Sequence, residues 1–121
     1  MRSGWQDKVK AVSPRFTFLD PRAHGLKDSL EYAKWDLAAV RASDVVVAFL
    51  ELSNPSGIGL ALEVGYARAL GKRIILIDEK SAADEVTARH FAIVRACADV
   101  VFDDFDGGLL YLRGFASPIR E

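Results

Sequence analysis

Glu63 is the residue whose place in the sequence calls most clearly for a chemical role. It lies in "GIGLALEVGYARAL". If residues Gly57 to Leu70 form a helix, a turn of roughly 100° per residue puts Glu63 on the apolar face, between Ala67 and Leu70. Burying an ionised carboxylate costs several kcal/mol, where a leucine would gain about 2 kcal/mol. A shorter or rotated helix would leave Glu63 near an edge, but we favour a functional carboxylate.

The loop before this helix, "ELSNPSGIG", supplies polar side chains and permissive backbone. Asn54 and Ser56 offer hydrogen-bonding groups, and the helix start offers unpaired N–H groups to an anion or a sugar hydroxyl. Gly57 and Gly59 allow a ligand to approach the backbone closely. This glycine spacing matches neither the dinucleotide-binding fingerprint nor a P-loop with its lysine, and by itself it also fits a plain turn.

Two aspartates are further candidate site residues. Asp20 follows the apolar run "FTFL" in a loop, "LDPRAHG", that also holds Arg22 and His24. Asp36 lies about 100° from Leu37 on the flank of an apolar helical stripe, and its helix precedes the strand that leads to Glu63. Asp36 is therefore either a solvated helix residue or a second site carboxylate.

The remaining reactive side chains indicate no metal and no cofactor. His24 and His90 lack the spacing of metal ligands, so we interpret both as surface or packing residues. Trp5 and Trp35 are interpreted as packing residues rather than stacking platforms.

Alternating strands and helices must position these residues. Apolar runs with little alternation predict parallel strands covered on both faces, at Phe16 to Leu19, Val45 to Leu50, Arg73 to Ile77 and Asp99 to Phe102. Helical patterns cover residues 27–44, with Asp28 or Ser29 as N-cap, then 57–70, ended by Gly71, and finally 81–97 and 106–115. This order predicts an α/β fold: a three-layer, doubly wound, flavodoxin- or Rossmann-like parallel sheet.

The start of the chain departs from that plan. "MRSGWQDKVKAV" predicts a turn and a helix, whereas a doubly wound domain normally opens with a central strand. Either the fold works with four strands, or the natural start lies upstream and Met1 is an internal methionine; we favour a sheet that lacks its usual first strand. Ligands of such sheets bind beyond the carboxyl ends of the strands, where the Asp20 and Asn54 loops fall.

Composition limits the class of protein. The 121 residues suit a single domain, 1–121. A net charge of −1 without charged blocks argues against a nucleic-acid polymer or a membrane surface as partner. No apolar run approaches the ~20 residues of a membrane span. The polar N-terminus and the lone Cys97 favour a cytoplasmic protein.

Together these motifs resemble the nucleoside 2-deoxyribosyltransferase family and the related 2'-deoxynucleoside 5'-monophosphate N-glycosidases. The resemblance runs from "MRSGW" to about Asp104, with its core in "WDLAAVRASDVVVAFLELSNPSGIGLALEVGYARALGKRIILI". It implies Glu63, in the E-x-G-x-A helix, as nucleophile and Asp36 as an active-site residue. "MRSG" resembles the end of the family's first strand and its first glycine loop, which implies Arg2 and Ser3 as ligand contacts. The loop before Glu63 lacks the acid of the nucleoside-preferring transferases, and its serine is closer to the monophosphate hydrolases.

The resemblance implies cleavage of an N-glycosidic bond. A carboxylate attacks C1' of a 2'-deoxyribosyl group to give a covalent glycosyl-enzyme, and the sugar passes to another base or to water. Asp36 would orient or supply the proton for the leaving base, while Ser56 and Arg2 would suit a 5'-phosphate. The expected partner is a small-molecule nucleoside or nucleotide, and the expected assembly is a homodimer or higher homo-oligomer. The alternative is a non-catalytic nucleotide-binding or sensing module; the base and the choice between transfer and hydrolysis stay open.

Overall fold

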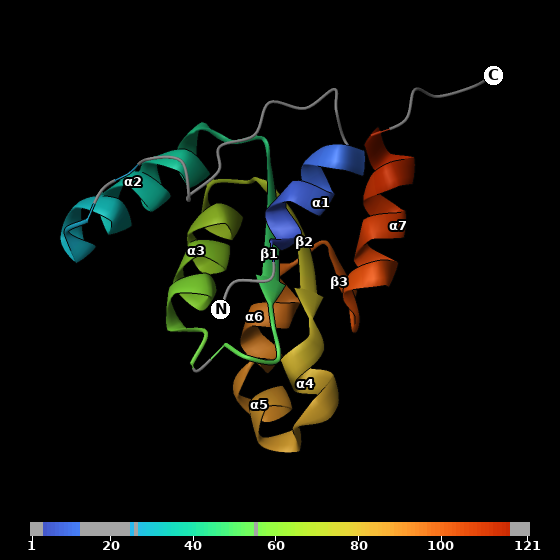
Figure 1. Cartoon of the computed structure of the whole chain (residues 1–121). Coiled ribbons are helices and arrows are strands. Elements are labelled where there is room, and N and C mark those ends of the chain that lie inside the picture. The colour runs from blue at the N-terminus through green and yellow to red at the C-terminus, as the bar shows by residue number, and fades with distance from the viewer. Residues whose placement is uncertain (1–3, 13–24, 26, 55, 117–121) are drawn as a thin grey trace.

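A parallel sheet forms the centre of the molecule. The structure, a computed structural model, describes residues 4–12, 25, 27–54 and 56–116. In these residues the sheet has three strands in the order β1-β2-β3: β1 (Val45–Leu50), β2 (Arg73–Asp78) and β3 (Val100–Phe102). Because all are parallel, their carboxyl ends meet at one edge (Figure 1). The predicted strand Phe16 to Leu19 lies outside the described residues.

Helices cover both faces of the sheet (Figure 1). One face carries α1 (Trp5–Val12) and α7 (Phe105–Ala116), which pack against each other. The other face carries α2 (Ser29–Ala42), α3 (Ile58–Ala69) and α6 (Ala92–Cys97). Two short helices, α4 (Glu79–Ala83) and α5 (Glu85–His90), follow β2. The predicted three-layer α/β arrangement is confirmed.

Strand β2 contributes side chains to the hydrophobic cores on both faces of the sheet. Successive side chains of a strand point to opposite faces. Ile74 and Leu76 pack with Val64 of α3, whereas Ile75 packs with Val9 of α1 and Leu112 of α7. Ile74 to Ile77 are all fully buried, as expected of a central parallel strand. Each such side chain stabilises the fold by about 1.5–3 kcal/mol.

Helix α7 approaches β2 closely at Gly108. A Cβ atom built at Gly108 would stand 2.4 Å from Cδ1 and 2.5 Å from Cγ1 of the buried Ile77. Only a residue without a side chain permits this separation between helix and strand. At Gly114, on the same helix, an added Cβ would meet nothing within 4 Å.

The predicted helix 81–97 is wrong as one continuous element. It is divided into α4, α5 and α6, because Asp84 has an extended backbone (φ −143°, ψ 114°) and begins α5 as its N-cap. Its carboxylate accepts hydrogen bonds from Val86 N at 3.2 Å and from Thr87 Oγ1 at 2.6 Å. These bonds hold the pKa of Asp84 below its usual value. Because α5 restarts after Asp84, its axis does not continue that of α4.

Helix α2 has less contact with the core than its apolar pattern predicts. Asp28 is the N-cap, its Oδ2 accepting from Glu31 N at 3.1 Å. Val40, near the other end, is buried against the sheet, but Leu30 remains 63% exposed. Figure 1 shows the first half of α2 projecting beyond the sheet. The packing that holds α2 is therefore concentrated in its C-terminal half.

Candidate active site

The loop between β1 and α3 is built by its own polar side chains. The Oδ1 atom of Asn54 accepts hydrogen bonds from Ser56 N (3.1 Å) and Gly57 N (2.7 Å). The Ser56 hydroxyl accepts from Ile58 N at 3.3 Å. Two of the predicted binding residues, Asn54 and Ser56, thus shape the start of α3.

Gly57 has a packing reason for being glycine. Its φ is 71°, in the left-handed region, and it is the N-cap of α3. A Cβ atom there would lie 2.6 Å from the Phe91 ring and 2.9 Å from Leu50 Cδ1. Gly59 is exposed, and a Cβ atom there would meet nothing within 4 Å. Of the two glycines, only Gly59 stands where a ligand could reach the backbone.

Lys80 ties this loop to the neighbouring strand. It lies in α4, directly after β2, and its Nζ donates to the backbone oxygen of Asn54. The helix start beside it has no acidic residue in the first turn, and its N-cap, Gly57, has no side chain with which to pair the N–H groups after Ile58. Unsatisfied N–H groups at a helix start together with a nearby ammonium favour an anion.

Helix α3 turns a different side to the sheet than predicted. Val64 and Ala67 are fully buried, with Leu60 packed beside them, whereas Leu70 is 39% exposed. The apolar residues surround most of this helix, so the pattern did not fix its rotation. Glu63 is on the flank of the buried stripe rather than in its middle, and it is partly buried.

Glu63 and Asp36 form a pair of carboxylates on adjacent helices. Helices α2 and α3 pack together, and the Oδ1 atom of Asp36 is shielded from solvent. Burial, and then the charge of Asp36, raises the pKa of Glu63 to about 7. Two acids within electrostatic reach, one of them with a strongly raised pKa, are typical of catalytic sites.

The other predicted site residues are either in the loop between β1 and α3 and the first turn of α3, or outside the described part of the chain. Arg2, Ser3 and Asp20 lie outside the described residues.

Within the described part of the chain, no group of three or more His, Cys, Asp or Glu side chains is arranged to hold a metal ion. No described helix is both long and apolar enough to cross a bilayer.

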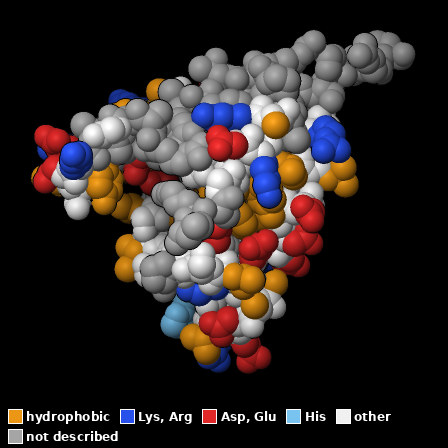
Figure 2. Space-filling view, viewed as in Figure 1, with side chains coloured by type: hydrophobic (Ala, Val, Ile, Leu, Met, Phe, Trp, Pro, Cys, Tyr) orange, Lys and Arg blue, Asp and Glu red, His pale blue; other side chains and the backbone are white. Residues whose placement is uncertain are grey.

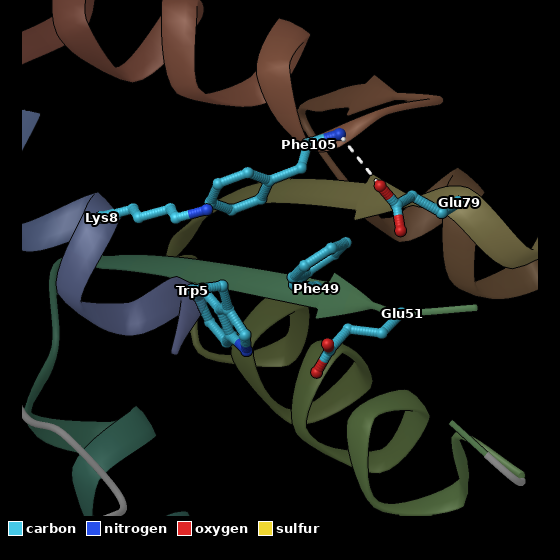
Figure 3. A pocket seen from close by; sticks show the side chains of 6 residues that line it. All are labelled: Trp5, Lys8, Phe49, Glu51, Glu79 and Phe105. Carbon is cyan, nitrogen blue, oxygen red and sulfur yellow. Dashed lines mark hydrogen bonds between the residues drawn. The ribbon is translucent and has the colours of Figure 1, made fainter. Parts of the chain in front are cut away.

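A cavity of about 200 Å³ opens beside the carboxyl ends of β1 and β2, on the face covered by α1 and α7. Figure 3 shows the side chains that line it: Trp5, Lys8, Phe49, Glu51, Glu79 and Phe105. No sequence motif pointed to Lys80, Glu51 or Glu79 as candidate residues. Each directly follows a predicted strand or lies within three residues of its end, which is where ligands of open α/β sheets bind.

The structure is that of an α/β protein with a pair of carboxylates on two helices beside a parallel sheet. A sequence model of one family, nucleoside 2-deoxyribosyltransferase, matches residues 6–106. The chain belongs to the nucleoside 2-deoxyribosyltransferase family, an enzyme family that acts on small-molecule nucleosides by deoxyribosyl transfer. No curated protein and no solved structure gives a significant match.

Proposed function

We propose that this protein cleaves the N-glycosidic bond of 2'-deoxynucleosides or their 5'-monophosphates through a covalent glycosyl-enzyme on Glu63. The observation that carries the proposal is the Glu63–Asp36 pair, in which burial and the second carboxylate raise the pKa of Glu63 to about 7. Membership of the family supports the substrate class. A carboxylate held against this electrostatic cost is expected of a reacting group rather than of a packing residue.

The pair is suited to a two-step displacement. The ionised Glu63 attacks C1', the bond between C1' and the base nitrogen breaks, and the base leaves with the bonding electrons and takes up a proton. Asp36 lies beside Glu63 and is assigned to orienting the leaving base, while water supplies the proton. Another base or water then attacks C1' and releases the Glu63 carboxylate.

The β1–α3 loop favours a substrate that carries a 5'-phosphate. The Ser56 side chain is exposed at a helix start that lacks acidic residues, and the Lys80 ammonium is hydrogen-bonded to the same loop. Such groups bind phosphate well. Asn54 and Gly57 hold the loop in shape, Gly59 leaves its backbone open, and Arg2, Ser3 and Asp20 complete the set of proposed contacts. A homo-oligomer is proposed as the assembly.

Chromatography of reaction mixtures tests the proposal. The protein is incubated with 2'-deoxynucleosides or their 5'-monophosphates, with and without an acceptor base. New nucleoside that requires the acceptor identifies a transferase, and free base released from monophosphates alone identifies a hydrolase. Glu63→Gln should abolish either product, while Glu85→Gln, on the exposed surface of α5, should not. A near-normal rate for Glu63→Gln contradicts the nucleophile assignment, and no product from any substrate favours a binding module.

A further inference from the structure

The cavity between α1, α7 and the strand ends has an aromatic corner. The rings of Trp5 and Phe49 meet edge to face, with centroids 5.5 Å apart and planes at 89°. Phe105 stacks on Phe49 at 5.0 Å. Figure 3 shows Phe49 between the other two rings. Rings set at right angles can form two adjacent walls of a pocket for an organic cation.

The charges around this corner also favour a cation. Glu51 and Glu79 line the cavity with a single Lys8. Glu79 Oε2 accepts from Phe105 N at 3.3 Å, whereas the Glu51 carboxylate makes no hydrogen bond or ion pair with the described residues. Asp104 and Asp106 flank Phe105 in the chain. In Figure 2 acidic side chains gather on the part of this face near the strand ends and the start of α7.

Lys8 shows that one ring of this corner, Phe105, accepts an ammonium group. Its Nζ lies 6.0 Å from the centroid of the Phe105 ring, within the range of a cation–π contact. Lys8 comes from α1 at the rim of the cavity and is exposed. The two lining carboxylates exceed this one cation, so a net negative charge remains for a ligand.

We propose that this cavity is a second binding site, separate from the Glu63–Asp36 pair, for the alkylammonium group of a small organic cation. The ammonium lies against Trp5 and Phe49 and pairs with Glu51. A volume of about 200 Å³ holds a head group of a few non-hydrogen atoms. The pair at Glu63 is on helices of the opposite sheet face, so the cation site does not depend on the proposed reaction.

Nuclear magnetic resonance tests this site with choline as the probe and 3,3-dimethyl-1-butanol as its uncharged counterpart of the same shape. The chain has two tryptophans, so the indole N–H signal of Trp5, assigned with Trp5→Phe, has an internal control in Trp35. At constant ionic strength, choline should shift the Trp5 signal saturably and leave that of Trp35 in place. The alcohol should bind about tenfold more weakly, because it lacks the cation–π and ionic attraction.

Charge variants complete the test. Glu51→Gln should weaken choline binding roughly fivefold and Lys8→Gln should strengthen it, while Glu85→Gln, which removes the same charge far from the cavity, should leave it unchanged. Retained dispersion of the amide spectrum shows that each variant is folded. Equal binding of the alcohol, equal shifts of both tryptophans, or no effect of Glu51→Gln with a folded spectrum would each overturn the proposal. Failure to detect glycosidic cleavage would not, since no variant used here touches Glu63 or Asp36.

Discussion

At the residue scale, the raised pKa of Glu63 sets the pH range in which it can act as a nucleophile. The pKa is about 7, with burial as the larger cause and the Asp36 charge as the smaller one. The reaction requires the ionised form. The rate should therefore rise with pH up to about 7 and level off above it, as measured by initial rates of base release.

Asp36→Asn tests how much the charge of Asp36 contributes to the raised pKa of Glu63. The substitution removes the negative charge but leaves the burial of Glu63, so the rising limb of the pH profile should move partway towards acid. The maximal rate should also fall, because the carboxylate that is proposed to orient the leaving base is lost. An unmoved acid limb in a folded, active variant would mean that Asp36 does not act on Glu63.

Because its pKa is raised in the folded chain, Glu63 lowers the free energy of unfolding above neutral pH. Below its ordinary pKa of 4.5, Glu63 is protonated in both the folded and the unfolded chain and contributes nothing. As pH rises to about 7 the unfolded chain ionises first, and the folded state is destabilised relative to it. Glu63→Leu should therefore raise the melting temperature near pH 8 by roughly 4 °C, a value discounted for the side chain's partial exposure, and the gain should shrink near pH 5. A clear fall near pH 8 would identify Glu63 as a structural partner.

At the scale of elements, Lys80 connects the end of β2 to the loop that begins α3. Lys80→Met removes the hydrogen bond to the Asn54 carbonyl and a positive charge beside the helix start. We expect KM for the monophosphate to rise several-fold with a smaller change in kcat. Lys80→Arg should restore much of the loss, and Lys27→Met, at an exposed position, should have no effect. A loss of thermal stability with unchanged kinetics would limit Lys80 to a structural role.

The contact between α7 and β2 should be sensitive to a single methyl group. Gly108→Ala places a Cβ against the buried Ile77 and should destabilise the fold by about 1–3 kcal/mol. Gly114→Ala, on the same helix, adds a Cβ in open space and should stabilise the fold by up to about 1 kcal/mol. Chemical denaturation of the two variants measures both effects. Equal stabilities would show that α7 can move away from the strand without cost.

Sequence patterns predicted the strands better than the faces and breaks of the helices. The apolar run Val45 to Leu50 has the same bounds as β1, because a strand buried on both sides needs an unbroken run. The break before α5 depends on the hydrogen bonds of Asp84, which no apolar period records. The rotation of α3 was ambiguous because large apolar residues such as Leu62 and Val64 lie on several sides of it.

At the scale of the whole molecule, candidate residues could be recognised where one segment of the sequence carries the signal, and not where the fold brings distant segments together. Glu63 was selected as a candidate because an acid interrupts an apolar helix. Lys80 and Glu51 are 29 residues apart in the sequence, and only the pairing of β1 with β2 brings their strand ends together. Trp5 was interpreted as a packing residue, which its contact with Phe49 bears out, yet it also lines the cavity.

Helix α2 is packed against the core mainly by its C-terminal half, and this affects the temperature at which activity is lost. Asp36 is on a helix whose first half is exposed and whose buried contact, Val40, is near the other end. Local unfolding needs less free energy where few apolar contacts must be broken. Backbone amides in the first half of α2 should therefore exchange with deuterium faster than those of α3. Turnover should then decline at temperatures at which the sheet is still intact, because Asp36, the first residue of the better packed half, loses the support of the turns before it while the core is still closed.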